Sequence, residues 1–125
     1  MLKKDEVDLE EEKIRIKINN LDDEKRKVFY KDVKDKLKDP DTYAVLNWFF
    51  IAGLHHFYLE KWKRGVFNLS IFILGIIFMS LSFFEIGFFI IIIISVIELG
   101  ALFNSQVIVQ DYNNKVYEET LNKIK

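Results

Sequence analysis

The chain has 125 residues, with 18 basic and 19 acidic side chains, a net charge of −1 and no cysteine. This length accommodates one small domain and a flanking segment, and the lack of cysteine excludes disulfides, thiolate catalysis and cysteine-based zinc sites. Nucleic-acid binding needs an excess of basic charge, so we expect no nucleic-acid partner.

Charge is concentrated in the first third of the chain. Residues 1–42 contain 12 basic and 13 acidic side chains, whereas residues 43–103 contain three of each. No apolar core follows the charged N-terminus, so we expect no cleavable signal peptide. We therefore predict a charged N-terminal arm at residues 1–42, of which residues 1–12 are expected to be loose.

Within this arm, Ile14, Ile16 and Ile18 alternate with two basic residues. A period of two is typical of a short strand, although no partner strand is evident. Two interpretations stay open here. The segment is either an extended stretch that pairs only in an oligomer or on another protein, or a disordered linker.

The segment at about residues 21–38 has the pattern of an amphipathic helix. Asn20 can cap its free amides, and acidic residues follow where they suit the positive end of the helix dipole. A narrow apolar stripe at roughly helical spacing is formed by Val28, Phe29, Val33 and Leu37. Pro40, the only proline, is expected to end this helix, because its ring disfavours a helical conformation at the preceding residue.

Three hydrophobic segments follow, at residues 43–59, 65–81 and 86–103. Between residues 65 and 103 the only charged side chains are Glu85 and Glu98. One helix of that length would measure about 58 Å, whereas the apolar core of a bilayer is about 30 Å thick. We therefore predict a helical hairpin in a membrane, with its turn at residues 82–85.

The predicted fold is an all-α membrane protein with two to three hydrophobic helices, namely the hairpin at residues 65–103 and a helix at residues 43–59. The charged amphipathic helix precedes this membrane domain, which covers residues 43–105. A polar C-terminal tail follows at residues 106–125. Its apolar residues predict a short amphipathic helix at the protein surface or the membrane interface.

A short motif closes the first hydrophobic segment: Gly53-Leu54-His55-His56-Phe57-Tyr58-Leu59, followed by Gly65. It resembles the signature of the TM-two domain family, small membrane domains named for a pair of transmembrane helices. The positions that match the family pattern are Gly53, His55, Phe57, Tyr58, Leu59 and Gly65. The positions that depart from it are His56 in place of Arg, Glu60 in place of Gly, and Glu98 in place of Asp. The resemblance covers about residues 43–105 and implies no specific activity, because the family's activities are mostly unassigned.

Two adjacent histidines, His55 and His56, are candidates for chemistry. Neighbouring side chains on a helix point about 100° apart, so we expect the pair not to chelate one metal ion easily. We therefore predict no metal site and no cofactor. One histidine is expected to hydrogen-bond within the helix packing, while the other reaches the lipid headgroups.

Glu98 is the most informative polar residue, because an ionisable group inside an apolar helix is expensive to bury unpaired. If both segments cross the membrane, Glu98 and His55 lie at nearly the same depth. We therefore predict an intramembrane polar pair between them, with Lys61 or Arg64 as competing partners. A clasp that fixes helix packing and a role in proton or ion handling both stay open.

The orientation depends on residues 43–59. Basic residues favour the cytoplasmic side, and the link at residues 82–85 carries none, so we expect this link outside. If residues 43–59 cross fully, the basic arm lies outside, against the rule; if they are re-entrant or interfacial, it is cytoplasmic. We favour a cytoplasmic arm.

Four aromatic residues near segment ends are expected to anchor helices at the headgroups: Tyr43, Trp48, Tyr58 and Trp62.

We expect a multi-pass protein of a prokaryotic plasma membrane, in contact with the lipid bilayer. The sequence shows no phosphate loop, no Ser–His–Asp arrangement and no paired carboxylates, so we expect no enzyme. The leading function is an anchoring, scaffold or assembly module that forms a homo-oligomer or binds a protein partner through residues 1–42. The alternative is a small oligomeric pore, channel or transporter subunit that uses Glu98 and His55.

Overall fold

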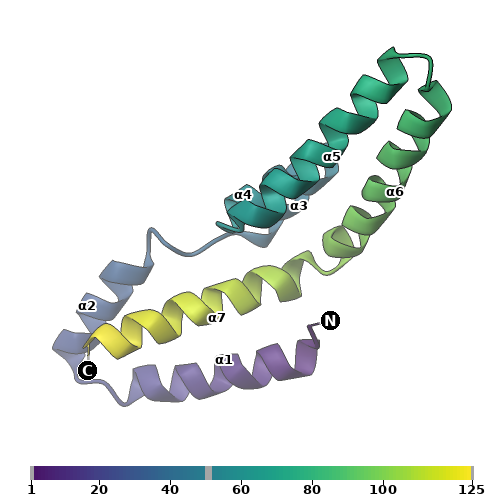
Figure 1. Ribbon diagram of the computed structural model, residues 1–125. Coiled ribbons are helices and arrows are strands. Elements are labelled where there is room, and N and C mark those ends of the chain that lie inside the picture. The colour runs from purple at the N-terminus through teal and green to yellow at the C-terminus, as the bar shows by residue number, and fades with distance from the viewer. Residues whose placement is uncertain (1, 50–51, 125) are drawn as a thin grey trace. The chain divides into compact units, whose positions relative to one another are not determined.

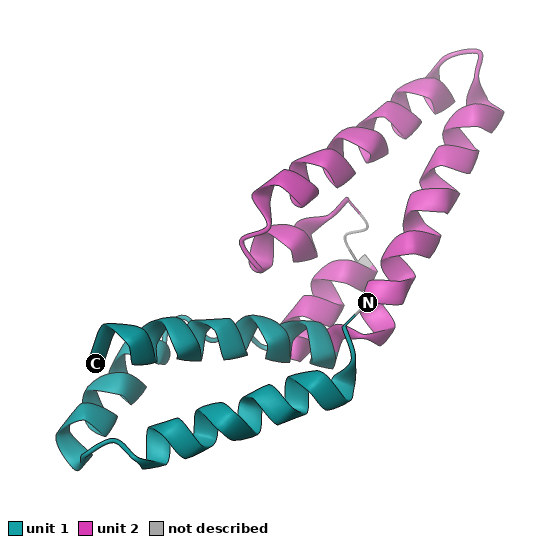
Figure 2. Ribbon diagram, turned by 60° about the horizontal axis from the view of Figure 1, so that its bottom comes forward, with its two compact units in different colours: residues 1–39, 106–125 teal, residues 40–105 magenta. Residues whose placement is uncertain are grey.

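The computed structural model describes residues 2–49 and 52–124, and within these ranges every regular element is a helix (Figure 1). The chain divides into two compact units (Figure 2). Unit 1 combines residues 1–39 with residues 106–125, and unit 2 comprises residues 40–105. The all-α part of the predicted fold class is therefore confirmed, but the predicted arm and tail belong to one folded unit.

Unit 1 contains α1 (Lys4–Asn19), α2 (Asp23–Val33) and nearly all of α7 (Ser105–Ile124). Its core of buried residues is formed by Ile14, Ile18, Phe29, Val33 and Leu121. A buried hydrogen bond also holds α7 against α1: the Asn114 side chain donates to the Val7 carbonyl oxygen at 3.1 Å. The predicted tail, with its short surface helix, is thus a helix of 20 residues that completes the core of unit 1.

The predictions of a loose segment at residues 4–12 and of a strand at residues 14–18 are wrong, because both stretches lie within α1. Ile14 and Ile18 are one helical turn apart and both face the core, whereas Ile16 is 53% exposed. Arg15 also pairs with Glu11 and Glu12 at helical spacing. Three isoleucines at this spacing fit either period. The buried cluster that favours the helix includes Leu121, far along the chain.

The helix expected at about residues 21–38 is shorter than predicted and begins elsewhere. The cap is Asp22, whose carboxylate accepts from the Lys25 amide at 2.8 Å, and the helix ends at Val33. Of the predicted stripe, Phe29 and Val33 are buried, while Val28 is 51% exposed. Asp22 takes the capping role because its backbone is extended just before the first helical residue, as a cap requires.

Replacing Asp22 with alanine is expected to lower the free energy of unfolding of unit 1 by about 1 kcal/mol, the usual effect of losing an N-cap. The matched control is Asn20→Ala, which removes the cap predicted from sequence and is expected to change little. Chemical denaturation followed by circular dichroism measures both. A larger loss for Asn20→Ala than for Asp22→Ala would contradict the observed cap.

Unit 2 contains α3 (Pro40–Phe49), α4 (Leu54–Tyr58), α5 (Trp62–Ser80) and α6 (Phe84–Phe103). Helices α5 and α6 lie side by side as an antiparallel hairpin (Figure 1). Both are long and apolar enough to cross a membrane. The two helices expected at residues 65–81 and 86–103 are thus observed with small shifts in their ends.

The single helix expected at residues 43–59 is wrong, because α3 ends at Phe49 and α4 begins at Leu54; residues 50–51 lie outside the described ranges. Gly53 precedes α4 with a φ of 93°, a left-handed conformation that breaks a helix and that glycine adopts without strain. The expectation that Pro40 ends the preceding helix is wrong, because α2 already ends at Val33. Pro40 instead begins α3, since proline is well tolerated in a first helical turn.

Candidate functional site

Two glycines position the short helix α4 against α5. A Cβ atom on Gly53 would lie 3.0 Å from the Cβ of Asn68, and one on Gly65 would lie 2.8 Å from the Phe57 ring. Because neither glycine has a side chain, the turn before α4 and the Phe57 ring both pack directly against α5. Three of the residues that carry the family resemblance therefore have a packing role in this chain.

Three buried side chains meet where α4 faces α6. The Nε2 atom of His55 lies 2.6 Å from Oε2 of Glu98, and Nε2 of His56 lies 3.1 Å from the same oxygen. The exposed fractions are 0% for His55, 3% for His56 and 4% for Glu98. The structure thus brings together the predicted pair of His55 and Glu98 and adds His56 as a third member; we call these three residues the His–His–Glu cluster.

The expectation that the histidines diverge is wrong, as is the expectation that one of them reaches the headgroups. Their ring centroids are 4.0 Å apart, and both Nε2 atoms approach one carboxylate oxygen. The angle of about 100° applies to the Cβ directions on a helix. Side-chain torsions beyond Cβ allow two adjacent imidazoles to converge on an acceptor supplied by another helix.

Two residues of α3 close the other side of the cluster. The Asn47 side chain donates to the backbone carbonyl oxygen of Glu98 at 2.9 Å, and both residues are buried. Tyr43 meets the His55 ring edge-to-face, with 5.3 Å between centroids. Tyr43 is only 2% exposed, so its predicted place at the headgroups is wrong. Trp48 and Trp62 are 59% and 63% exposed.

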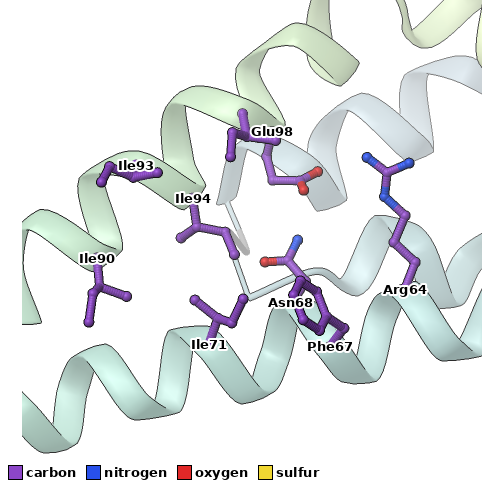
Figure 3. A pocket seen from close by; sticks show the side chains of 9 residues that line it. Arg64, Phe67, Asn68, Ile71, Ile90, Ile93, Ile94 and Glu98 are labelled. Carbon is purple, nitrogen blue, oxygen red and sulfur yellow. The ribbon is translucent and has the colours of Figure 1, made fainter. Parts of the chain in front are cut away.

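A cavity of about 330 Å³ lies between α5 and α6 and reaches Glu98 (Figure 3). Its apolar wall consists of Phe67, Ile71, Ile90, Ile93, Ile94 and Ile97. Its polar end is formed by Arg64, Asn68 and Glu98, and Figure 3 shows the Asn68 amide extending from α5 toward the Glu98 side chain. Arg64, a predicted competitor for Glu98, forms no ion pair within the described part of the chain.

Sequence reasoning missed the two amides of this site, Asn47 and Asn68, which are 3% and 2% exposed. The signal was available, because an asparagine inside an apolar segment must find a partner when it is buried. Asn47 has one in the Glu98 carbonyl group. Neither polar atom of the Asn68 side chain has a partner among the described residues, and the same is true of His55 Nδ1.

No family model, no curated protein and no solved structure matches this chain. The resemblance to the TM-two domain family therefore stays a prediction carried by the motif residues. What the His–His–Glu cluster can do follows from its own chemistry. It can clasp α4 to α6 through two hydrogen bonds, and its three ligand atoms, all within 4.8 Å of one another, could surround a cation.

Proposed function

We propose that this protein is a non-enzymatic membrane anchor, in which the hairpin of α5 and α6 crosses the bilayer and ties unit 1 to it. The supporting observation is the apolar surface that the hairpin exposes. Its large exposed apolar side chains include Val66, Phe67, Phe84, Phe89, Ile93, Val96, Ile97 and Phe103. Soluble proteins rarely expose a contiguous apolar surface of this extent, whereas lipid tails cover it well.

Two other kinds of apolar helix fit these observations poorly. The core helix of a soluble protein is mostly buried. In each of α5 and α6, by contrast, only 17% of an apolar stretch of 18 residues is buried. A signal sequence lies near the N-terminus, whereas α5 begins at Trp62. The lengths also match, because helices of 19 and 20 residues measure about 28 and 30 Å, close to the thickness of a bilayer core.

Unit 1 is built from segments on both sides of unit 2 in the sequence, and this supports a topology with two membrane crossings. Residues 1–39 and 106–125 pack into one core, so both flanks of unit 2 belong on the same side of the membrane. Helix α3 has 10 residues and measures about 15 Å, too short to cross. Residues 43–59 therefore act as a re-entrant or interfacial segment, which reconciles the arm with the distribution of basic residues.

The same observations favour an anchor over a pore. The Glu98 carboxylate is engaged by two histidines, an arrangement that fixes helix packing. The sequence predicted that a protein partner binds through the arm at residues 1–42. Most of that arm belongs to unit 1, so a partner would bind the outer face of this folded unit. The large apolar side chains that α1 exposes there include Leu9 and Ile16, at 63% and 53%.

Labelling of single cysteines tests the topology, and the native chain is a clean background because it contains none. We expect Lys13→Cys and Glu119→Cys to react with an impermeant maleimide from the same side of sealed membranes. We expect Ser82→Cys, in the link of the hairpin, to react only from the other side. All three positions are exposed, so burial does not limit the reaction.

Membrane fractionation of the same variants supplies the control. Protein that stays in the soluble fraction would overturn the membrane proposal. Labelling of Lys13→Cys and Glu119→Cys from opposite sides would leave the membrane proposal standing and overturn the topology of two crossings.

A further inference from the structure

We propose that the His–His–Glu cluster is a binding site for a divalent transition-metal ion of the zinc class. Its donor atoms are the Nε2 atoms of His55 and His56 and a carboxylate oxygen of Glu98, and they come from two helices, α4 and α6. The proposal goes beyond membrane anchoring and does not depend on it.

The distances between donor atoms suit an ion after a small adjustment. Zinc binds imidazole nitrogen at about 2.0–2.1 Å and carboxylate oxygen at about 2.0–2.2 Å, so tetrahedral ligands lie roughly 3.2–3.5 Å apart. The nitrogen-to-oxygen distances are 2.6 and 3.1 Å, and all three donor atoms lie within 4.8 Å of one another. Side-chain rotations that move the donor atoms of Glu98 and the two histidines by about 1 Å would therefore bring them to these separations.

The proton count and the charge also balance. Without the ion, each Nε2 carries the proton that it donates to Glu98 Oε2, and two neutral imidazoles with one carboxylate have a charge of −1. With the ion, each imidazole carries its proton on Nδ1 and presents the Nε2 lone pair. The Nδ1–H of His55 then has no acceptor among the described residues, a cost that the bonds to the ion must offset. A dication then changes the buried charge from −1 to +1, without the release of a proton, and screens a carboxylate that is 4% exposed.

A second, independent observation is the state of Asn68. Its side chain is 2% exposed and has no partner among the described residues, yet it lines the same cavity as Glu98 (Figure 3). Buried polar atoms without partners are rare and call for an explanation, such as an ion. Figure 3 draws the amide nitrogen of Asn68 as the end nearer to Glu98. A half-turn of the unpartnered amide would present its oxygen instead, as an acceptor for water bound at the fourth position, which three protein ligands leave open.

The donor set indicates the class of ion. Two imidazoles and one carboxylate suit zinc, iron, nickel or copper, whereas magnesium and calcium prefer sites built of oxygen atoms. The cavity of about 330 Å³ leaves space beside Glu98, with Arg64 and Asn68 in its lining. We therefore expect zinc and cobalt to bind and magnesium not to compete.

The test uses the full-length chain without a histidine tag, purified in detergent and treated with a chelator. We expect the wild type to bind one zinc ion per chain, measured by elemental analysis after dialysis, and Co²⁺ to give the absorption of a tetrahedral site with nitrogen ligands. Loss of a residue that only hydrogen-bonds to a metal ligand weakens metal binding about 10–100-fold. His56→Ala removes a ligand itself, so we expect it to weaken zinc binding by about 100-fold or more. Glu98→Gln keeps a hydrogen-bond acceptor and is expected to have the same effect.

The matched control is Asn47→Ala, which removes the hydrogen bond to the Glu98 backbone but no donor atom. It is expected to bind zinc within a few-fold of the wild type. Helix content measured by circular dichroism shows which variants are folded. The proposal is overturned if the folded wild type binds no more zinc than folded Glu98→Gln, or if Asn47→Ala loses zinc as completely as His56→Ala while staying folded.

Discussion

Replacing Glu98 with alanine in metal-free detergent is expected to lower the free energy of unfolding of unit 2 by about 2–6 kcal/mol, because each buried donor left without an acceptor costs about 1–3 kcal/mol. The substitution leaves two buried imidazole N–H groups without an acceptor and opens a hole between α4 and α6. Unfolding in a mixed-micelle titration, followed by circular dichroism, measures the loss. Glu98→Gln keeps an acceptor and is expected to lose clearly less.

A double-mutant cycle separates the clasp from general damage. We expect His55→Ala and Glu98→Ala to be non-additive by about 0.5–3 kcal/mol, because the two side chains touch. Additive losses would show that the predicted pair contributes no coupling. Trp48→Ala serves as a control, since Trp48 also lies in unit 2 but is 59% exposed.

Replacing Gly87 with alanine is expected to lower the free energy of unfolding of the hairpin by about 1–3 kcal/mol, the usual cost of overpacking. A Cβ atom there would collide with the Gly75 carbonyl oxygen and would lie 2.6 Å from the Met79 backbone nitrogen. These atoms belong to the backbone of α5, so relief requires the two helices to separate. Small residues at such crossings allow close helix packing in membranes.

The matched control is Gly100→Ala on the same helix, where a Cβ atom meets nothing within 4 Å. This substitution is expected to leave stability unchanged or to raise it by up to about 1 kcal/mol, since alanine favours a helix over glycine. The same mixed-micelle titration compares the two variants. Equal effects at both positions would contradict the close contact of α5 and α6 at Gly87.

The features that were predictable from the sequence are those with a strong local cause. The apolar residues of α5 and α6 are uninterrupted by charge for longer than one span, and a hairpin follows from the limited thickness of a bilayer. The need of Glu98 for a polar partner was also predictable, because burying a carboxylate unpaired is expensive. His55 was chosen as that partner on the assumption that residues 43–59 cross the membrane; the pair is observed, but α3 and α4 do not form that crossing helix. The hairpin and the need of Glu98 for a partner rest on physical limits that hold whatever the rest of the chain does.

The errors arose where distant contacts decide between local alternatives. The isoleucines at residues 14–18 fit a strand or a helix, and packing in the buried cluster that includes Leu121 favours the helix. The break within residues 43–59 depends on the left-handed Gly53 and its close approach to Asn68. Sequence patterns report the preferences of neighbouring residues, and these preferences are weaker than burial in a shared core.

By itself, the sequence determined that the chain is helical, that it contains an apolar hairpin and that Glu98 needs a polar partner. The tertiary structure decided that the two charged ends form one folded unit and that His56 joins His55 at the same carboxylate oxygen. The physical reason is that hydrophobic length and the cost of burying a charge are properties of single segments. Convergence of side chains from different helices depends instead on how those helices pack.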